Sequence, residues 1–271
     1  MAMTHRQTTH WLNRVYRQYH HRRYTELDPI VMLYRFDDVS DREIIAVLSS
    51  ALAYGRVRSI LNTLQHIAAI MTPTPRRWLE QHSRHAMHCA FDGFRYRFTS
   101  EDDLVALLWA MRKLATQYGS LGQALAEVDD PEAATLHMAL SGWVRRMEHE
   151  AERPLPHLLP DPQRGSACKR LHLMMRWMVR HDAIDPGGWE HLGQHRLTIP
   201  VDTHMHRLSQ RMHWTDRRTA DARTAAQITD QLRRHAPQDP VRFDFALTRP
   251  GILNEPMLRT QSSAEVGFSK V

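Results

Sequence analysis

Hydrophobic positions along the chain repeat with helical spacing, and the alternation typical of β-strands is nearly absent. Trp11, Val15 and Tyr19 recur every four positions within residues 8–23, which places them on one face of a helix. Ser100 stands before the acidic run Glu101–Asp103, as an N-cap stands before the first turn of a helix. Periodicity, caps and breakers predict further helices at 41–53 (capped by Ser40), 57–71, 121–128, 133–150, 166–180, 203–212, 221–235 and 240–247. The sequence therefore predicts an all-α fold.

The length of 271 residues fits one large domain or one domain with an added lobe. A proline-rich stretch at 154–162 predicts a stiff connector near residues 151–165, which is the best internal boundary. Helical periodicity ends after Pro250 and Gly251. We therefore expect one domain over residues 1–250 and an irregular C-terminal tail over residues 251–271.

Composition excludes several classes of protein. Two cysteines cannot form a disulfide scaffold, a four-cysteine zinc site or an iron–sulfur cluster. Eleven glycines without a glycine-rich phosphate loop argue against a nucleotide-binding α/β enzyme. The longest apolar run, Leu104–Met111, is too short to cross a bilayer, and the first residues do not resemble a signal peptide. We expect a cytoplasmic protein without cofactor, resident metal or membrane partner.

Basic residues are segregated along the chain. Residues 1–24 and 164–181 each carry five Lys or Arg side chains and no acid, whereas residues 101–135 carry a net charge of −5. An arginine-favouring genome would explain the net charge of +6 but not this clustering. Segregated positive charge is typical of proteins that bind polyanions.

The most informative segment is residues 166–180. Leu171, Met174, Met175 and Met178 form a core-facing stripe of a helix, and Lys169, Arg176 and Arg180 share the opposite side. Gly165 and Ser166 predict the start and cap of this helix, with Lys169 in its first turn. The positive end of a helix disfavours a protonated amine, and nucleophilic lysine chemistry needs the neutral amine. Lys169 is one of only three lysines among 36 basic residues. A solvated lysine on a polar face is the alternative.

A second segment, residues 197–212, predicts another helix with an acid at its start. Pro200 favours an extended residue before it, and Asp202 occupies the N-cap position. Arg207 and Arg211 lie four residues apart on the polar face. By itself, an aspartate N-cap indicates only a helix start.

At these two segments the sequence resembles the helix-hairpin-helix DNA glycosylase superfamily. There a lysine opens the second helix of a hairpin, and an aspartate follows in a Val-Asp-Thr-His or Pro-Val-Asp segment. Lys169 in Gly165–Lys169 matches the lysine, and Asp202 in Ile199–His204 matches the aspartate. The long gap between them looks more like the archaeal 8-oxoguanine glycosylase branch than the endonuclease III branch. Most of the chain resembles an uncharacterised bacterial family, a domain of unknown function distantly related to these enzymes.

The resemblance implies a two-lobed helical fold, with the site in a cleft between the lobes and damaged double-stranded DNA as partner. Lys169 would attack the sugar C1′, expel the damaged base and form a Schiff base that permits strand cleavage, while Asp202 would stabilise the positive sugar. The protein would associate with the nucleoid when bound to DNA. The expected DNA-binding residues are Arg164, Ser166, Arg170, Arg176, Arg180, His204, Arg207 and Arg211. Trp177 and Trp214 are candidates for a base-stacking platform.

The sequence departs from the superfamily at two points. Residues 160–166 replace the usual Leu-Pro-Gly-x-Gly hairpin, and the cluster cysteines are missing, as they are in several branches. Two alternatives stay open: a DNA-binding module of this fold without catalysis, and a metal-dependent hydrolase. The second would use the histidine-rich run His82–Cys89 or the spacing of Asp202, His204 and His206. In the segment 239–247, which predicts a helix capped by Asp239 with Pro240 first, Asp244 is expected to be a buried acid paired with an arginine.

Overall fold

The computed structural model describes residues 3–253, 255 and 256, and their fold is all-α, as predicted. The α-helices are α1 (His5–Tyr19), α2 (Val39–Ala51), α3 (Val57–Ile70), α4 (Pro75–Gln81), α5 (Arg84–Ala90), α6 (Glu101–Tyr118), α7 (Leu121–Ala126), α8 (His137–Ala151), α9 (Lys169–Val179), α10 (Thr203–Arg211), α11 (Ala222–Arg233) and α12 (Asp244–Ile252). Short 3-10 helices lie at Arg22–Tyr24, Pro29–Arg35, Pro162–Arg164, Glu190–Leu192 and Gln194–Arg196. The strands β1 (Arg95–Tyr96) and β2 (Thr99–Ser100) form one antiparallel hairpin.

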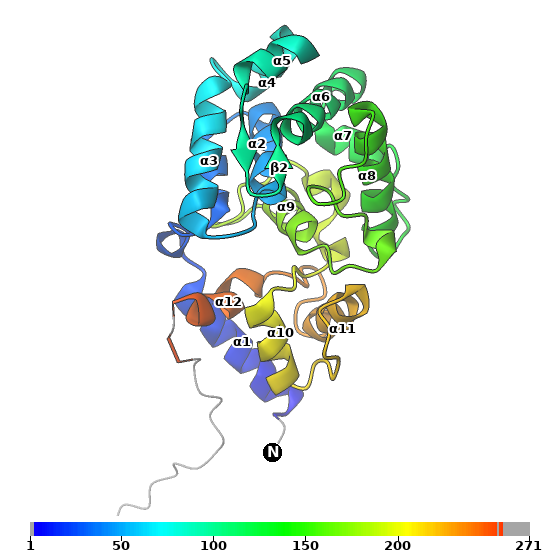
Figure 1. Ribbon diagram of the computed structural model, residues 1–271. Helices are drawn as coiled ribbons and strands as arrows, with labels where there is room; N and C mark the ends of the chain where they lie inside the picture. The colour runs from blue at the N-terminus through cyan, green and yellow to red at the C-terminus, as the bar shows by residue number, and fades with distance from the viewer. Residues whose placement is uncertain (1–2, 254, 257–271) are drawn as a thin grey trace, which may run out of the picture.

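The helices form two groups that lie one above the other in Figure 1. The upper group holds α2 to α9 and the hairpin, and the lower group holds α1, α10, α11 and α12. The first helix thus packs with the last ones, since α1 contacts α12 and α12 also contacts α10. The chain passes between the groups twice, after α1 and again between α9 and α10.

Helix α2 forms the centre of the upper group. Its residues from Glu43 to Ala51 are buried, because α9, α4 and the 3-10 helix Pro29–Arg35 pack around it. Glu43 is buried, and its carboxylate has hydrogen-bond partners. It accepts hydrogen bonds from the Leu121 and Gly122 backbone N–H groups at the start of α7 and from Trp189 Nε1. An acid at a helix N-terminus is electrostatically favoured, so Glu43 links α2 to α7 across the core.

The helix ends differ from the prediction where side-chain partners decide them. The Ser100 cap of α6 is confirmed, with a full capping box to Asp103. Helix α2 begins two residues earlier than predicted, because the Asp38 carboxylate, and not the Ser40 hydroxyl, accepts the backbone N–H at the helix start. The predicted Asp239 cap is wrong. Asp239 pairs with Arg180, and α12 begins at Asp244.

The connector near 151–165 is a loop with one 3-10 turn, as predicted, but α8 and α9 on either side of it both lie in the upper group. It therefore does not separate the two groups. The predicted tail begins too early, because α12 continues through Pro250 to Ile252, and residues 257–271 lie outside the described part. Within the residues described, no helix combines the length and apolar character needed to cross a membrane.

Candidate functional site

A pocket of about 180 Å³ lies between the two groups of helices. Its walls come from the start of α3 and the first two turns of α9 above, and from the start of α10 and the whole of α12 below. Apolar side chains such as Ile60, Leu173 and Ile252 line part of it. Its charged lining residues are Asp28, Lys169, Arg176, Asp202, Asp244 and Arg249.

Lys169 is the first residue of α9 and is half-buried in this pocket. The predicted position in the first turn is confirmed, but the predicted Ser166 cap is wrong. The N-cap is Cys168, in a left-handed conformation with φ of 42°, and it makes no side-chain capping bond. Ser166 Oγ instead accepts a hydrogen bond from the Cys168 backbone N–H. The buried stripe of α9, with Met174 and Met178 fully buried, fixes the helix that carries the lysine.

Asp202 approaches the same pocket from the lower group. As predicted, it is the N-cap of α10, and its Oδ1 accepts a hydrogen bond from the Met205 backbone N–H at 2.7 Å. It is half-buried and lines the pocket together with Lys169. The fold thus brings together two side chains that lie 33 residues apart in sequence and belong to different groups of helices.

Arg176 and Arg180 do not lie on a solvent-facing surface, and their predicted role in DNA binding is wrong. Their exposed fractions are 2% and 3%. Arg176 pairs with Asp185 and Asp244, at 3.1 and 2.5 Å, and Arg180 pairs with Asp185, Asp182 and Asp239. The lower group and the loop after α9 cover this side of the helix, so its cations hold the fold together. Because both guanidinium groups are paired with buried or half-buried carboxylates, neither is available to bind a DNA phosphate.

Arg170 also differs from the prediction. Its guanidinium donates hydrogen bonds to the backbone carbonyls of Ala51 and His157, and it lies over the Tyr54 ring. It thereby ties the end of α2 to the connector before α9. Burial among these carbonyls lowers the pKa of Arg170, so its guanidinium is committed to the interior and not to DNA.

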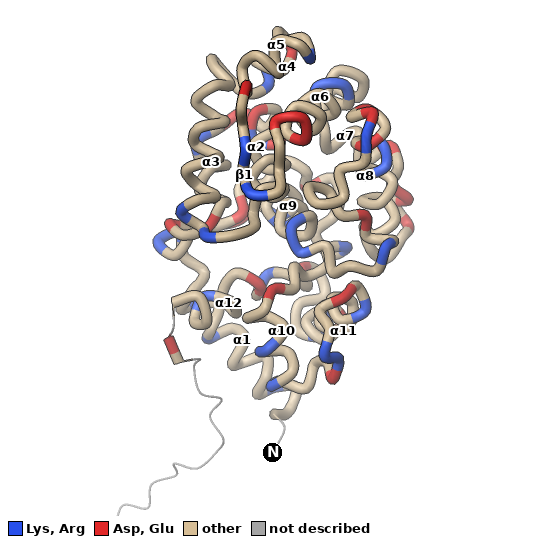
Figure 2. The backbone as a smooth tube through the Cα atoms, in the orientation of Figure 1, with Lys and Arg blue, Asp and Glu red and all other residues tan. Residues whose placement is uncertain are grey.

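Four of the predicted DNA-binding residues are exposed: Arg164, Ser166, Arg207 and Arg211. Arg207 and Arg211 lie on α10 in the lower group, where basic positions are seen in Figure 2. His204 is half-buried, and its Nδ1 would lie 2.3 Å from a Cβ added to Gly251 of α12. The ring therefore packs against the backbone of α12 and contributes to the contact between α10 and α12.

The prediction of Asp244 as a buried acid paired with an arginine is confirmed by its bond to Arg176. Burial raises the pKa of Asp244 to about 6, against the opposing attraction of Arg176. Asp28 and Arg249, which pair at 3.3 Å, line the pocket and were missed by the sequence analysis. The available signal was the Asp28–Pro29 pair, because an acid before proline is typical of a helix start.

The side chains of the two tryptophans proposed for base stacking do not reach the pocket. Trp177 is fully buried in the core, and Trp214 is buried within the loop that follows α10. Neither lines the pocket. The most exposed large apolar side chain of the described residues is Phe98, at 77%, in the turn of the hairpin.

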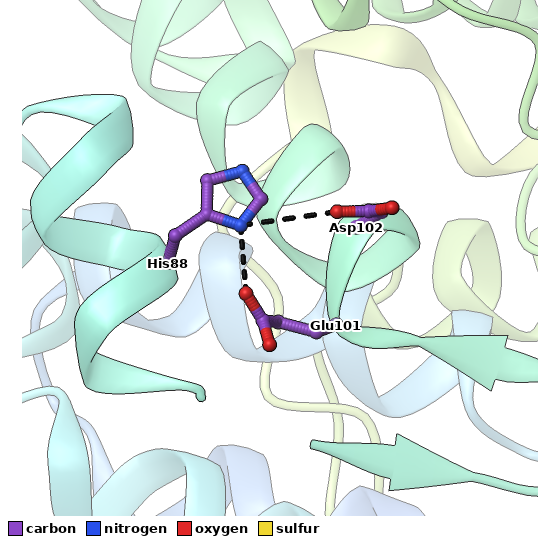
Figure 3. Close-up of side chains that lie close together, drawn as sticks. All are labelled: His88, Glu101 and Asp102. Atoms are coloured by element: carbon purple, nitrogen blue, oxygen red, sulfur yellow. Dashed lines mark hydrogen bonds and ion pairs between the residues drawn. The ribbon is translucent and has the colours of Figure 1, made fainter. Parts of the chain in front are cut away.

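The histidine-rich run gives one group of three side chains with ligand atoms close together, within the part of the chain that is described: His88, Glu101 and Asp102 (Figure 3). His88 Nδ1 lies 2.7 Å from Glu101 Oε1 and 3.9 Å from Asp102 Oδ1. Both acids belong to the first turn of α6, where the helix dipole favours carboxylates and repels cations. The hydrogen bond from His88 lowers the pKa of Glu101. The group is best explained as a histidine that is hydrogen-bonded to an acid at the helix start.

Two other residues considered as metal ligands, His82 and His206, bond backbone carbonyls. His82 stacks on Trp78 and bonds its carbonyl, while His206 bonds the Arg217 carbonyl at 2.9 Å. His204, as described, packs on α12. Asp202, His204 and His206 therefore do not form a ligand group.

A family model described as a protein of unknown function (DUF2400) matches residues 28–253. No curated protein and no solved structure matches the chain. The matched region includes every residue of the pocket wall except Leu27.

Proposed function

The chain belongs to the DUF2400 family of proteins of unknown function, and we propose that this member is a DNA glycosylase that removes a damaged base through a lysine Schiff base. The observation that carries the proposal is that Lys169 and Asp202 line one pocket from opposite groups of helices. The same two residues carry the sequence resemblance to helix-hairpin-helix glycosylases. A nucleophile and a carboxylate around one small pocket suit attack on an extruded nucleotide.

In the proposed reaction, the Lys169 amine forms a bond to the sugar C1′ as the bond from C1′ to the base nitrogen breaks. The electron pair leaves with the base, which takes up one of the two amine protons. The second amine proton goes to the ring oxygen O4′ as the C1′–O4′ bond breaks, which opens the sugar ring and leaves the Schiff base between C1′ and the lysine nitrogen. The Asp202 carboxylate stabilises the positive charge that grows on the sugar before the new bond is complete. Hydrolysis of the Schiff base returns the free lysine.

The neighbouring thiol is a poor alternative nucleophile. Cys168 is buried and its Sγ donates a hydrogen bond to the Pro160 carbonyl. Burial raises the pKa of Cys168 to about 11, so the reactive thiolate is scarce at neutral pH. This leaves the amine of Lys169 as the nucleophile at the start of α9.

With Arg176 and Arg180 buried, the hairpin and the start of α3 offer a better surface for DNA. Arg95 and Arg97, which precede Phe98 in the hairpin, are exposed, and so are Arg56 and Arg58 at the start of α3. Arg97 Nε would lie 2.9 Å from a Cβ on Gly55, which itself lines the pocket. Figure 2 shows basic positions at the hairpin turn and at the start of α9 on the same face. Exposed cations around an exposed aromatic ring fit phosphates and an unstacked base.

Covalent trapping tests the proposal. Borohydride reduces a Schiff base, so protein should become joined to DNA when incubated with one member of a panel of oxidised, deaminated and abasic duplexes. Lys169→Gln should abolish trapping, while Lys113→Gln, which removes an exposed amine from α6, should leave it unchanged. Asp202→Asn should slow base release on the order of a hundredfold, with little loss of stability because asparagine is also a good N-cap.

The outcomes separate the alternatives. Trapping that survives Lys169→Gln contradicts the assigned nucleophile. If no duplex of the panel is trapped although the protein binds DNA, the non-catalytic DNA-binding module is favoured. A loss of activity on removal of metal ions would instead favour the metal-dependent hydrolase.

A further inference from the structure

One side of α1 carries positive charge that the proposed reaction does not use. Arg6, His10 and Arg17 are exposed there, and Arg14 lies half-buried on the same side of the helix. No Asp or Glu precedes Glu26 in the chain, so α1 contributes no acid to offset these charges. The four residues of α1 are called its basic face below.

The basic face of α1 points away from the pocket. The buried side of α1, which includes Leu12, Val15 and Tyr19, packs against α12. Helix α12 supplies part of the pocket wall, whereas no residue of α1 lines the pocket. A nucleotide in the pocket is therefore separated from the basic face by α12.

Two arginines from neighbouring elements extend the positive surface. Arg234 is exposed at the end of α11, next to His235, whose ring stacks on His5 of α1 with 4.4 Å between the centroids. Arg242, in the turn before α12, lies 4.7 Å above the ring of Tyr16 on α1. Three elements of the lower group thus bring cations to one surface.

The exposed arginines of this surface are not neutralised within the part of the chain that the structure describes. Arg6, Arg17 and Arg234 form no ion pair with an acid there. The acids of the neighbouring segments are paired elsewhere, Asp239 with Arg180 and Asp230 with Arg233. The positive charge is therefore available to an external anion.

The character of the basic face favours the phosphate backbone of DNA. Arg6 and Arg17 lie about 16 Å apart along the helix axis, and one strand of a duplex carries about five phosphates over that length. No large apolar side chain of α1 is exposed. The helix thus lacks the apolar face that inserts into a membrane surface and the anchors that dominate a protein interface. Non-specific binding to DNA needs only the charges.

We propose that the basic face of α1, together with Arg234 and Arg242, binds the backbone of a second duplex, separate from the DNA at the pocket. One molecule then holds two segments of DNA at the same time. The proposal goes beyond the proposed function, because this contact needs neither Lys169 nor a damaged base. A protein that keeps one segment while it samples another searches DNA without full dissociation.

A bridging assay with undamaged DNA tests the proposal. One duplex is fixed to beads through biotin, and a fluorescent duplex is captured only when the protein binds both. The wild-type protein should capture the fluorescent duplex. The double variant Arg6→Gln with Arg17→Gln should reduce capture about tenfold or more at about 0.1 M salt, and it should fold because both positions are exposed.

A matched control separates the position of the charges from their number. Arg77→Gln with Arg145→Gln removes two exposed arginines from α4 and α8 of the upper group and should capture DNA as the wild-type protein does. The salt dependence of capture gives a second measurement. The slope of log affinity against log salt should fall by about two in the α1 double variant, because each lost phosphate contact contributes about 0.9.

Three results would overturn the proposal. The first is that the wild-type protein captures no second duplex. The second is that the α1 double variant captures DNA with the same affinity and slope as the wild-type protein. The third is that the wild-type protein, but not the variant, binds vesicles of equal parts phosphatidylcholine and phosphatidylserine while no duplex is bridged, which would make the basic face a membrane contact.

Bridging is independent of covalent trapping. Lys169→Gln lacks the proposed nucleophile and should bridge two duplexes as the wild-type protein does. If DNA is bridged but no duplex of the damage panel is trapped, the glycosylase proposal fails and the second DNA surface stands. If DNA is trapped but not bridged, the glycosylase proposal stands and the role given to α1 is wrong.

Discussion

Replacement of Arg180 by methionine distinguishes a buried structural cation from a DNA-binding one. Arg180 is 3% exposed and is shared by three carboxylates, of which Asp182 lies at 2.7 Å and Asp239 at 3.0 Å. The third, Asp185, is fully buried and is left with Arg176 as its cation. Methionine fills much of the volume of the side chain, so the change removes mainly the charge.

The expected cost follows from the uncompensated carboxylates. Breaking a buried ion pair by removing one partner costs about 3–5 kcal/mol, and the folding free energy of a domain is about 5–15 kcal/mol. With a urea m-value of about 2 kcal/mol/M, the unfolding midpoint should fall by about 2 M. The variant should therefore be folded in buffer, with a much smaller free energy of unfolding than the wild-type protein.

Urea unfolding followed by circular dichroism measures the effect. Arg207→Met is the matched control, because Arg207 is an exposed arginine on α10, and its midpoint should change little. Adding Asp185→Asn to Arg180→Met should recover part of the loss, because one buried charge is removed. If Arg180→Met and Arg207→Met unfold at the same midpoint, the assignment of Arg180 to the ion network is refuted.

Three further predictions concern acid stability and DNA contact. Burial, and then the charge of His137, lowers the pKa of His172 to about 4, so the buried imidazole stays neutral where an unfolded one is protonated. The contribution of the neutral His172 to the free energy of unfolding is present above pH 6.5 and is lost as the pH falls from 6.5 to 4. The variant His172→Leu should therefore reduce the acid-induced loss of this free energy by about 3 kcal/mol. An unchanged dependence of stability on pH would contradict this. Phe98→Ala should weaken binding to DNA with an unpaired base about tenfold or more by fluorescence anisotropy, whereas Met138→Ala, at another exposed apolar position, should not. Arg97→Ala should reduce the slope of affinity against salt by about one, and an unchanged slope would place the phosphate contacts elsewhere.

The periodicity of the sequence predicts the helices well because the core pattern is local. The stripe on α9 from Leu171 to Met178 is buried, and Asp202 caps α10 as expected. Local patterns fail where distant partners decide the outcome. A helical wheel places Arg176 and Arg180 opposite the stripe, but it does not show that Asp185, Asp239 and Asp244 cover that side.

The same limit applies to the pocket. Lys169 and Asp202 were found from the sequence because motifs mark them, and the structure brings both to one pocket. Asp28 carries only the local signal of an acid before a proline and Arg249 carries none, and they meet only because the chain before α2 returns to α12 more than 200 residues later. Phe98 stands in the turn of a hairpin whose strands have two residues each, which is too short to produce a pattern. These residues are set by packing between elements that lie far apart in sequence.

The buried ion network explains how the two candidate catalytic residues keep their relative position. Lys169 begins α9, and two turns later Arg176 of the same helix pairs with Asp244, the first residue of α12. Helix α12 in turn packs against α10, which Asp202 caps. The lysine and the aspartate are therefore joined through helices and one buried ion pair, without a direct bond between them. A pocket between two groups of helices could open or close by their relative movement, and the pair between Arg176 and Asp244 opposes that movement at the pocket itself.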